Sequence, residues 1–181
     1  MNMRSFLRVA GVLMVIGVSV HADEAKAPAL ADDMARLLKA SGAVSYARNA
    51  SYGAGIDEMA IGYGEDGKPV VGLATRKTKT YAEALAVVAV TPKDGAYTIA
   101  AAEIPTIATF HGKSQDLAKG ALKEITGKIF KDAKEARNLA DATTGATQYY
   151  KAIYVSYALM ASKIIEELSA NPDWPRTTLQ P

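Results

Sequence analysis

The sequence predicts an α+β domain in which an antiparallel β-meander packs against helices, with a long helix near the C-terminus. Between residues 56 and 103, short apolar runs alternate with turn residues, which is typical of strands joined by tight turns. On both sides of this region, apolar residues recur at steps of three and four, as expected for amphipathic helices. No internal repeat or low-complexity linker divides the chain.

The first 22 residues have the features of a secretory signal peptide. Arg4 and Arg8 precede an apolar run from Val9 to Val20, and the small Ala22 suits a cleavage site. About a dozen apolar residues are too few for a stable span of roughly 30 Å of hydrocarbon. We therefore expect cleavage after Ala22 and a periplasmic or otherwise extracytoplasmic protein, with a retained membrane anchor as the alternative.

The remaining chain is expected to contain a flexible tail over residues 23–30 and a single domain over residues 31–181. A first helix is expected from about Ala31 to Ala40, because Ser41 and Gly42 provide a stop. Residues 43–57 leave two alternatives open. Gly53 and Gly55 favour a loop, although the residues from 43 to 49 are also compatible with an extension of the helix.

Four consecutive strands with short links predict the meander. They are expected over Glu58 to Tyr63, Val70 to Arg76, Ala84 to Thr91 and Tyr97 to Glu103. Turn residues lie between the first two strands, at 62–69, and between the last two, at 92–95. Alanines at 82–89 are also compatible with a helix, but the β-branched residues around Val87 and Val90 favour a strand.

Two helical regions follow Pro105. An apolar stripe indicates a helix within residues 114–136, and a final helix is expected from about Ala146 to Ser169. The apolar residues of the final helix fall at steps of three and four, which directs one face toward the sheet. They are Tyr149, Ile153, Tyr157, Met160, Ile164 and Leu168. Asn171 and Pro172 are expected to end this helix, and the last residues to be extended.

Composition and charge exclude several classes of function. The chain contains 21 lysines and arginines, and the loss of Arg4 and Arg8 with the leader leaves 19 against 19 acidic residues. A near-neutral mature protein lacks the basic surface that nucleic-acid binding requires. Cysteine is absent, which excludes disulfides, thiol catalysis and attachment of c-type haem. The sequence also has no dinucleotide-binding fingerprint, phosphate-binding loop or metal-ligand spacing.

The segment Asp141-Ala142-Thr143-Thr144-Gly145-Ala146-Thr147 is the most informative in the sequence, because it stands where a loop turns into the final helix. A helix N-terminus offers free backbone N–H groups and partial positive charge, which favour a phosphate. Gly145 allows close approach of a cofactor or modifying enzyme, and Ala146 adds little bulk. Thr147 is then expected to present its hydroxyl group, while Thr143 or Thr144 caps the helix.

This segment resembles the D-x-x-[ST]-G-A-[ST] signature of the FMN-binding domain family, which includes the flavin-carrying subunits of sodium-translocating NADH:quinone reductase and of Rnf-type complexes. The resemblance implies that a flavin transferase joins the phosphate of FMN to Thr147. It also implies that Asp141, Thr144, Gly145 and Ala146 form the recognition and cofactor-binding segment. The chain has no counterpart of the T-P-G-L-G segment of many Rnf-type members, so no residue is assigned to the isoalloxazine ring.

The resemblance and the leader together predict an exported electron-transfer flavoprotein. It would carry covalent FMN and take electrons from a membrane-bound donor to a redox partner protein, rather than act as a stand-alone enzyme. The alternative is a periplasmic binding or scaffold module without flavin, in which the threonine-rich segment only caps a helix.

Other candidate residues have simpler explanations in the sequence. Arg76, Lys77 and Lys79 lie near a strand end and are candidates for contact with the phosphate or with an acidic partner, or for a solvated turn. His111 is the only histidine after the leader and has no accompanying serine motif. Adjacent acidic pairs at 32–33 and 166–167 are expected on solvated helix faces, since neighbouring helical residues point in different directions.

Overall fold

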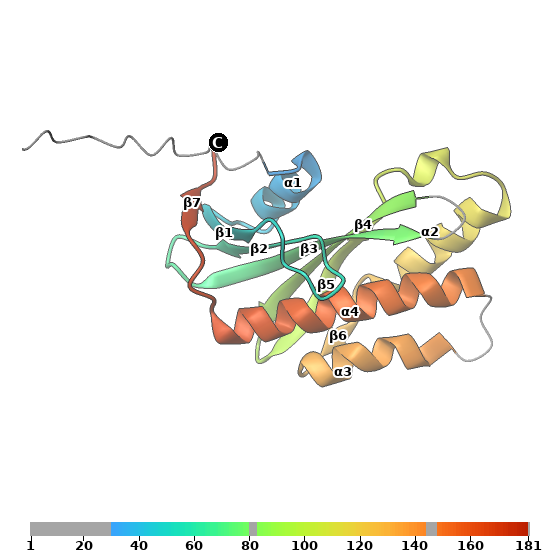
Figure 1. Cartoon of the computed structure of the whole chain (residues 1–181). Helices are drawn as coiled ribbons and strands as arrows, with labels where there is room; N and C mark the ends of the chain where they lie inside the picture. The colour runs from blue at the N-terminus through green and yellow to red at the C-terminus, as the bar shows by residue number, and fades with distance from the viewer. Residues whose placement is uncertain (1–29, 80–82, 144–147, 181) are drawn as a thin grey trace, which may run out of the picture.

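The computed structural model describes residues 30–79, 83–143 and 148–180 (Figure 1). The signal peptide expected over residues 1–22, and almost all of the tail expected over 23–30, lie outside the described residues. In the described residues no helix combines the length and the apolar character that crossing a membrane requires.

A seven-stranded antiparallel sheet in the order β6-β5-β4-β3-β2-β1-β7 forms the centre of the fold. Together with a long C-terminal helix it confirms the predicted α+β class. The strands are β1 (Ser45–Asn49), β2 (Glu58–Tyr63), β3 (Pro69–Lys79), β4 (Glu83–Lys93), β5 (Ala96–Glu103), β6 (Ile129–Phe130) and β7 (Arg176–Thr178). The helical elements are α1 (Asp32–Ala40), η1 (Ile107–Thr109), α2 (Lys113–Ile125), α3 (Ala133–Arg137), η2 (Asn138–Thr143) and α4 (Gln148–Ala170).

The predicted meander is confirmed as β2 to β5, and β2 has the predicted bounds. Strands β3 and β4 are longer than expected because the added residues are paired. Residues 77–79 of β3 pair with the start of β4, and residues 92–93 of β4 pair with β5. The turn between β4 and β5 places Asp94 and Gly95 at positive φ, as a two-residue hairpin turn requires. Pairing with neighbouring strands thus decides the strand ends.

The segment 43–57 is neither wholly a loop nor an extension of α1. Residues 45–49 form β1, which pairs with β2 on one side and with β7 on the other. Gly42, at a φ of 76°, ends the first helix and allows the chain to turn into this strand. The strand lacks a sustained apolar alternation in the sequence, since only Ala47 is fully buried.

The helix expected within 114–136 is interrupted. Helix α2 ends at Ile125, Thr126 is extended and Gly127 has a φ of 85°, and the short edge strand β6 precedes α3. The final helix begins at Gln148 and ends at Ala170, close to the predicted bounds, and Asn171 follows at positive φ. Beyond it, the predicted extended residues form β7 at the opposite edge of the sheet.

The two faces of the sheet carry separate apolar cores. On one face α4 lies across the strands, as Figure 1 shows, and α2 and α3 pack beside it. The predicted inward residues of α4 are buried there, namely Ile153, Tyr157, Met160, Ile164 and Leu168, while the side chain of Tyr149 is outside the described set. On the other face the short helix α1 covers a smaller core through Met34, Leu37 and Leu38.

Two glycines allow these helices to lie close to the sheet. A Cβ atom on Gly72 of β3 would lie 2.2 Å from Cγ2 of Ile164 in α4. On the opposite face, a Cβ atom on Gly62 of β2 would lie 2.7 Å from Cδ2 of Leu38 in α1. Real Cβ atoms do not approach other heavy atoms this closely, so both positions require a residue without a side chain.

Candidate functional site

The connection between η2 and α4 is the first candidate, since it contains the threonine-rich segment. Asp141 is exposed within η2, and α4 begins at Gln148. The other predicted cofactor-binding residues, Thr144, Gly145, Ala146 and Thr147, lie outside the described residues. The described residues therefore define the two elements that flank this segment.

Packing holds the preceding element in place. Leu139 of η2 and Ala136 of α3 are buried in the core beneath α4. Helix α3 is capped at its start, because the Asp132 side chain accepts a hydrogen bond from Glu135 N at 2.8 Å, and Lys131 N, one residue before the cap, donates to Glu135 Oε2 at 2.6 Å. These contacts bring the chain to Asp141 in a defined position.

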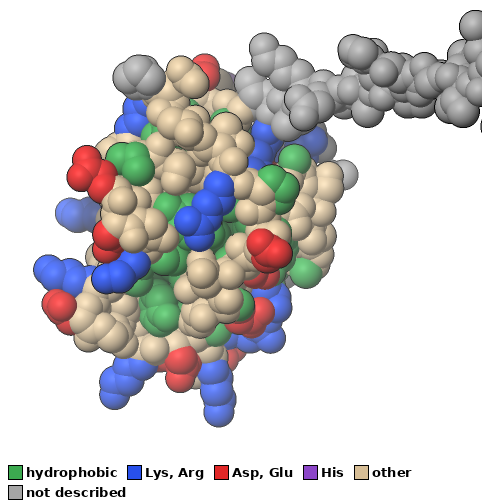
Figure 2. All heavy atoms as spheres, turned by 90° about the vertical axis from the view of Figure 1, so that its left-hand side faces the viewer, with side chains coloured by type: hydrophobic (Ala, Val, Ile, Leu, Met, Phe, Trp, Pro, Cys, Tyr) green, Lys and Arg blue, Asp and Glu red, His purple; other side chains and the backbone are tan. Residues whose placement is uncertain are grey.

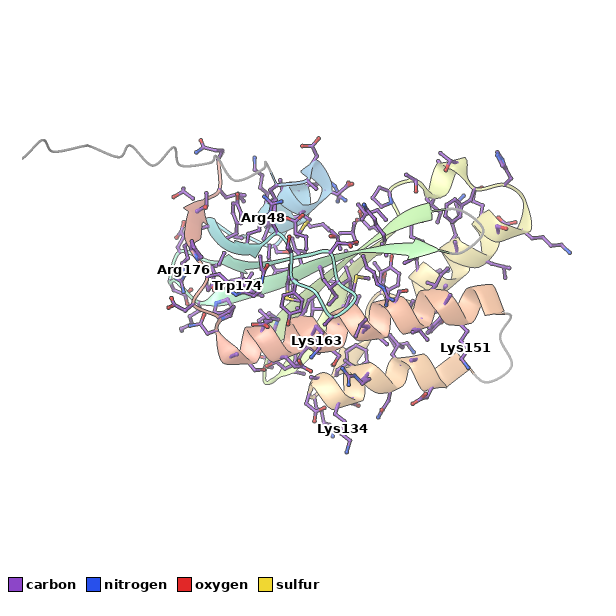
Figure 3. All side chains as sticks on the ribbon, viewed as in Figure 1. Arg48, Lys134, Lys151, Lys163, Trp174 and Arg176 are labelled. Carbon is purple, nitrogen blue, oxygen red and sulfur yellow. The ribbon has the colours of Figure 1, made fainter. Side chains whose placement is uncertain are left out.

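Contacts with α2 and the core hold the first turns of α4. The Tyr154 hydroxyl donates a hydrogen bond to Glu124 Oε2 of α2, and the Ile153 side chain is buried in the core. No acidic residue occurs in the first turn of α4, and Lys151 is exposed there, as Figure 3 shows. The partial positive charge of this helix end is therefore not neutralised by its own first turn.

Arg76 is the second feature of this region. It is half-buried on β3, on the same side of the sheet as Ala74 and α4. A Cβ atom on Gly55 would lie 3.5 Å from Leu159 Cδ2 and 3.9 Å from Arg76 Nη2, so both side chains lie close to Gly55. Arg76 Nη1 is fully buried and has no hydrogen-bond partner. The predicted basic cluster is nevertheless divided, because the neighbouring Lys77 is exposed and alternation along the strand directs it to the other face.

An anionic cofactor fits this unpaired group. A buried guanidinium nitrogen without an acceptor costs free energy, and a phosphate or an anionic ring system supplies acceptors for it. From the sequence alone, Arg76 was predicted only as one member of a basic cluster. Its separation from Lys77 depends on strand register, and its position close to Gly55 depends on how the chain folds over this face of the sheet.

The remaining candidates have ordinary structural roles. His111 is exposed between η1 and α2. Glu167 accepts a hydrogen bond from the Tyr52 hydroxyl at 2.7 Å, and Glu166 pairs with Lys163 at 2.5 Å. Across the described residues, no three histidine, aspartate or glutamate side chains are arranged to hold a metal ion.

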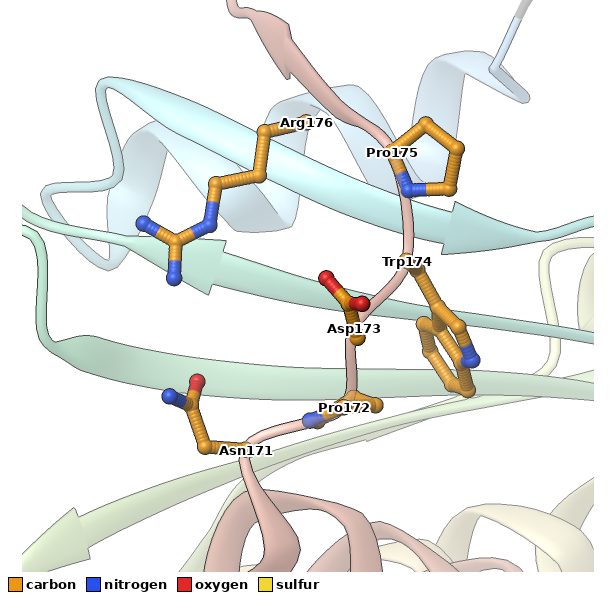
Figure 4. Close-up of a pocket in the computed structure, with 6 residues that line it drawn as sticks. All are labelled: Asn171, Pro172, Asp173, Trp174, Pro175 and Arg176. Atoms are coloured by element: carbon orange, nitrogen blue, oxygen red, sulfur yellow. The ribbon is translucent and has the colours of Figure 1, made fainter.

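A hollow of about 520 Å³ lies at the other end of α4, where one segment of the chain, Asn171 to Arg176, surrounds it (Figure 4). The Arg176 guanidinium carbon stands 3.7 Å above the ring of buried Tyr63. Trp174 meets Tyr52 edge to face, with ring centroids 6.1 Å apart. Figure 2, which shows this end of the molecule, has hydrophobic side chains and a basic side chain near its centre, with further charged side chains around its rim.

This hollow is remote from the threonine-rich segment. A helix of 23 residues is about 34 Å long, and α4 separates the two regions along its whole length. The hollow therefore belongs to the packing of the C-terminal segment over the end of the core, which the sequence analysis did not predict.

Comparison with known proteins identifies no relative, since no family model, curated protein or solved structure matches this chain.

Proposed function

We propose that this protein is an exported electron-transfer flavoprotein that carries FMN covalently, through a phosphoester bond to Thr147. The observation that carries the proposal is the sequence D-x-x-T-G-A-T immediately before the first residue of a 23-residue helix. The motif supplies the hydroxyl group, and the helix supplies backbone donors and partial positive charge for a phosphate.

The surroundings of the motif support the proposal electrostatically. The first turn of α4 contains no acid that would repel a phosphate. A phosphodiester keeps one negative charge, which the acid-free first turn of α4 favours.

Bound FMN would supply the redox chemistry, and the chain would supply position and electrostatics. The helix end would orient the phosphate, and packing against the rest of the fold holds the two described elements that flank the attachment segment, η2 and α4. Attachment by a covalent bond suits an exported protein, because a tethered group retains a high effective concentration where a dissociated one is diluted.

The proposed partners follow from the same chemistry. A flavin transferase would form the bond, a membrane-bound donor would supply electrons, and a redox partner protein or extracytoplasmic acceptor would receive them. We propose a periplasmic or other extracytoplasmic location on the basis of the leader, with cleavage after Ala22.

The test is the intact mass of protein produced together with a flavin transferase. The mass of the wild type should increase by that of FMN less one water, and the product should fluoresce in a denaturing gel. Thr147→Ala should lose both signals, whereas Thr147→Ser should keep them because the hydroxyl remains. Thr144→Ala is the matched control and should remain modified.

An unmodified, colourless wild type from cells with an active transferase would refute the proposal. That result would favour a periplasmic binding or scaffold module in which the threonine-rich segment is only a helix cap.

A further inference from the structure

We propose that the hollow at the C-terminal end of α4 binds a small zwitterion, a molecule that carries both a carboxylate and an ammonium group. Free amino acids and short peptides share this chemistry. The hollow is lined by the segment from Asn171 to Arg176, and its volume of about 520 Å³ is within the usual range of small-molecule sites. The proposal goes beyond the proposed function and does not depend on it, because the hollow shares no residue with the threonine-rich segment.

The first argument is that the lining segment follows a fixed path. It leaves α4 through Asn171, whose positive φ of 50° turns the chain, and it then joins the sheet as β7. Pro172 and Pro175 fix two further φ angles. Between them, Trp174 packs against the core and meets the Tyr52 ring edge to face. A ligand would therefore enter a preformed hollow, and binding would order little of the chain.

The second argument is the chemistry of the lining. Figure 4 shows the Asn171 and Arg176 side chains extending to the same side of the segment, with Asp173 between them, whereas Trp174 and Pro175 lie on the other side. The three polar side chains are exposed, and none of them takes part in an ion pair or a side-chain hydrogen bond with another described residue. Opposite charges that line one hollow without pairing with each other are both available to a ligand.

The third argument is the orientation of Arg176. Its guanidinium carbon lies 3.7 Å from the centre of the buried Tyr63 ring, a contact that cation–π attraction stabilises. A contact this close uses the face of the planar guanidinium group, so the N–H donors in its plane remain available. The Tyr63 hydroxyl has no hydrogen-bond partner, so it uses none of these donors. A planar set of donors held against a ring suits a carboxylate, which accepts two parallel hydrogen bonds.

The class of ligand follows from these groups. Arg176 would bind the carboxylate of the zwitterion, and Asp173 would accept hydrogen bonds from its ammonium group. The side-chain amide of Asn171 offers a donor and an acceptor, which match a peptide group or another polar group of the ligand. A simple anion would be repelled by Asp173, and a simple cation would be repelled by Arg176. The two charges together therefore favour a zwitterion over either kind of simple ion.

The test is a titration of the purified protein followed by NMR. Trp174 is the only tryptophan in the chain, so its indole N–H gives one signal from the lining segment. The probes are glycine and alanyl-alanine, each compared with its N-acetylated form, which lacks the ammonium group, and its C-terminal amide, which lacks the carboxylate. At least one free probe should shift the signal to saturation at millimolar concentrations, and the tighter of the two distinguishes a free amino acid from a peptide.

Each blocked form should bind about tenfold more weakly than its free probe or worse, because one charge-assisted contact is lost. A signal that neither free probe saturates, or equal affinities for free and blocked forms, would overturn the inference.

Variants assign the two charges. Arg176→Met should lower the affinity for the free probe about tenfold or more, and Arg176→Lys should recover part of it. Asp173→Asn should weaken binding of the free probe but should not weaken binding of the N-acetylated form, which has no ammonium group to lose. Arg137→Met is the matched control, because it removes an equal charge from an exposed residue of α3 that does not line the hollow, and it should bind as the wild type does.

An equal loss of affinity in Arg137→Met, or an equal effect of Asp173→Asn on the free and N-acetylated probes, would overturn the inference. Urea unfolding of each variant checks that the fold is retained. If Arg176→Met lowers the urea midpoint, the two probes bound to Asp173→Asn decide the question, since that exposed side chain has no described partner. The same titration of unflavinylated Thr147→Ala protein keeps the result separate from the mass test of the proposed function.

Discussion

The close contact between β3 and α4 allows a quantitative prediction. In Gly72→Ala, the new Cβ atom would lie 2.2 Å from Ile164 Cγ2 and 3.3 Å from both Ile61 Cδ1 and Leu168 Cγ. A favourable carbon–carbon contact is about 3.5–4.0 Å, so the helix must move by more than about 1 Å. Overpacking of a core costs about 1–3 kcal/mol of unfolding free energy. We expect a loss near the upper end of that range, because the new Cβ atom is fixed to the backbone of β3 and cannot rotate away.

The assay is urea unfolding followed by the fluorescence of Trp174, the only tryptophan in the chain. Ile164→Ala alone should lose about 2–5 kcal/mol of unfolding free energy through the cavity it leaves. In the double variant the alanine at 164 removes the clashing methyl group, so the combined loss should be smaller than the sum by about 1 kcal/mol or more.

Gly64→Ala is the matched control. Its Cβ atom would lie 3.1 Å from Val70 Cγ1 and 3.4 Å from Asp66 Oδ1 in a surface turn, where both side chains can move. Its stability should stay within about 1 kcal/mol of the wild type. A Gly72→Ala protein as stable as the control, or strictly additive losses with Ile164→Ala, would refute the inferred helix contact.

Two further predictions concern buried tyrosines. Tyr63→Phe should keep or raise the unfolding free energy, because the buried Tyr63 hydroxyl has no hydrogen-bond partner. Tyr157→Phe should lower the unfolding free energy by about 1–3 kcal/mol, because the Tyr157 hydroxyl donates a hydrogen bond to Glu103 O at 2.6 Å. Equal losses for the two variants in urea unfolding would contradict this prediction. Burial raises the pKa of Tyr157 far above its usual range, and burial and then the Glu167 hydrogen bond raise the pKa of Tyr52. Because both folded pKa values are raised, their contribution to stability is complete below about pH 10 and is lost as the pH rises further. Urea unfolding at several pH values should show this decline, and it should be shallower in Tyr157→Phe; an unchanged decline would exclude Tyr157 as a cause.

Local sequence was sufficient for much of the fold. The runs of β-branched residues and the turn at Asp94 and Gly95 predict β2 to β5, because strand preference and hairpin turns depend on neighbouring residues. The steps of three and four in α4 predict its buried face for the same reason. The threonine-rich segment is also a local signal, and the function proposed from it remains a prediction.

Only the tertiary structure decided the elements that depend on distant partners. Strand β1 has little apolar alternation and is held between β2, the next strand along the chain, and β7, which comes from the C-terminal end. The break after α2 follows from Gly127 and from the pairing of β6 with β5. Pairing across the sheet is a long-range contact, which a local pattern does not specify.

The same distinction applies to the candidate site. The sequence by itself determined which hydroxyl group the motif offers and that a helix follows it. The unpaired state of Arg76 Nη1 was decided only by tertiary structure, because it requires the strand register that separates Arg76 from Lys77 and places it on the face of the sheet that α4 covers. A side chain's charge is visible in the sequence, but whether that charge has a partner depends on residues brought together by folding.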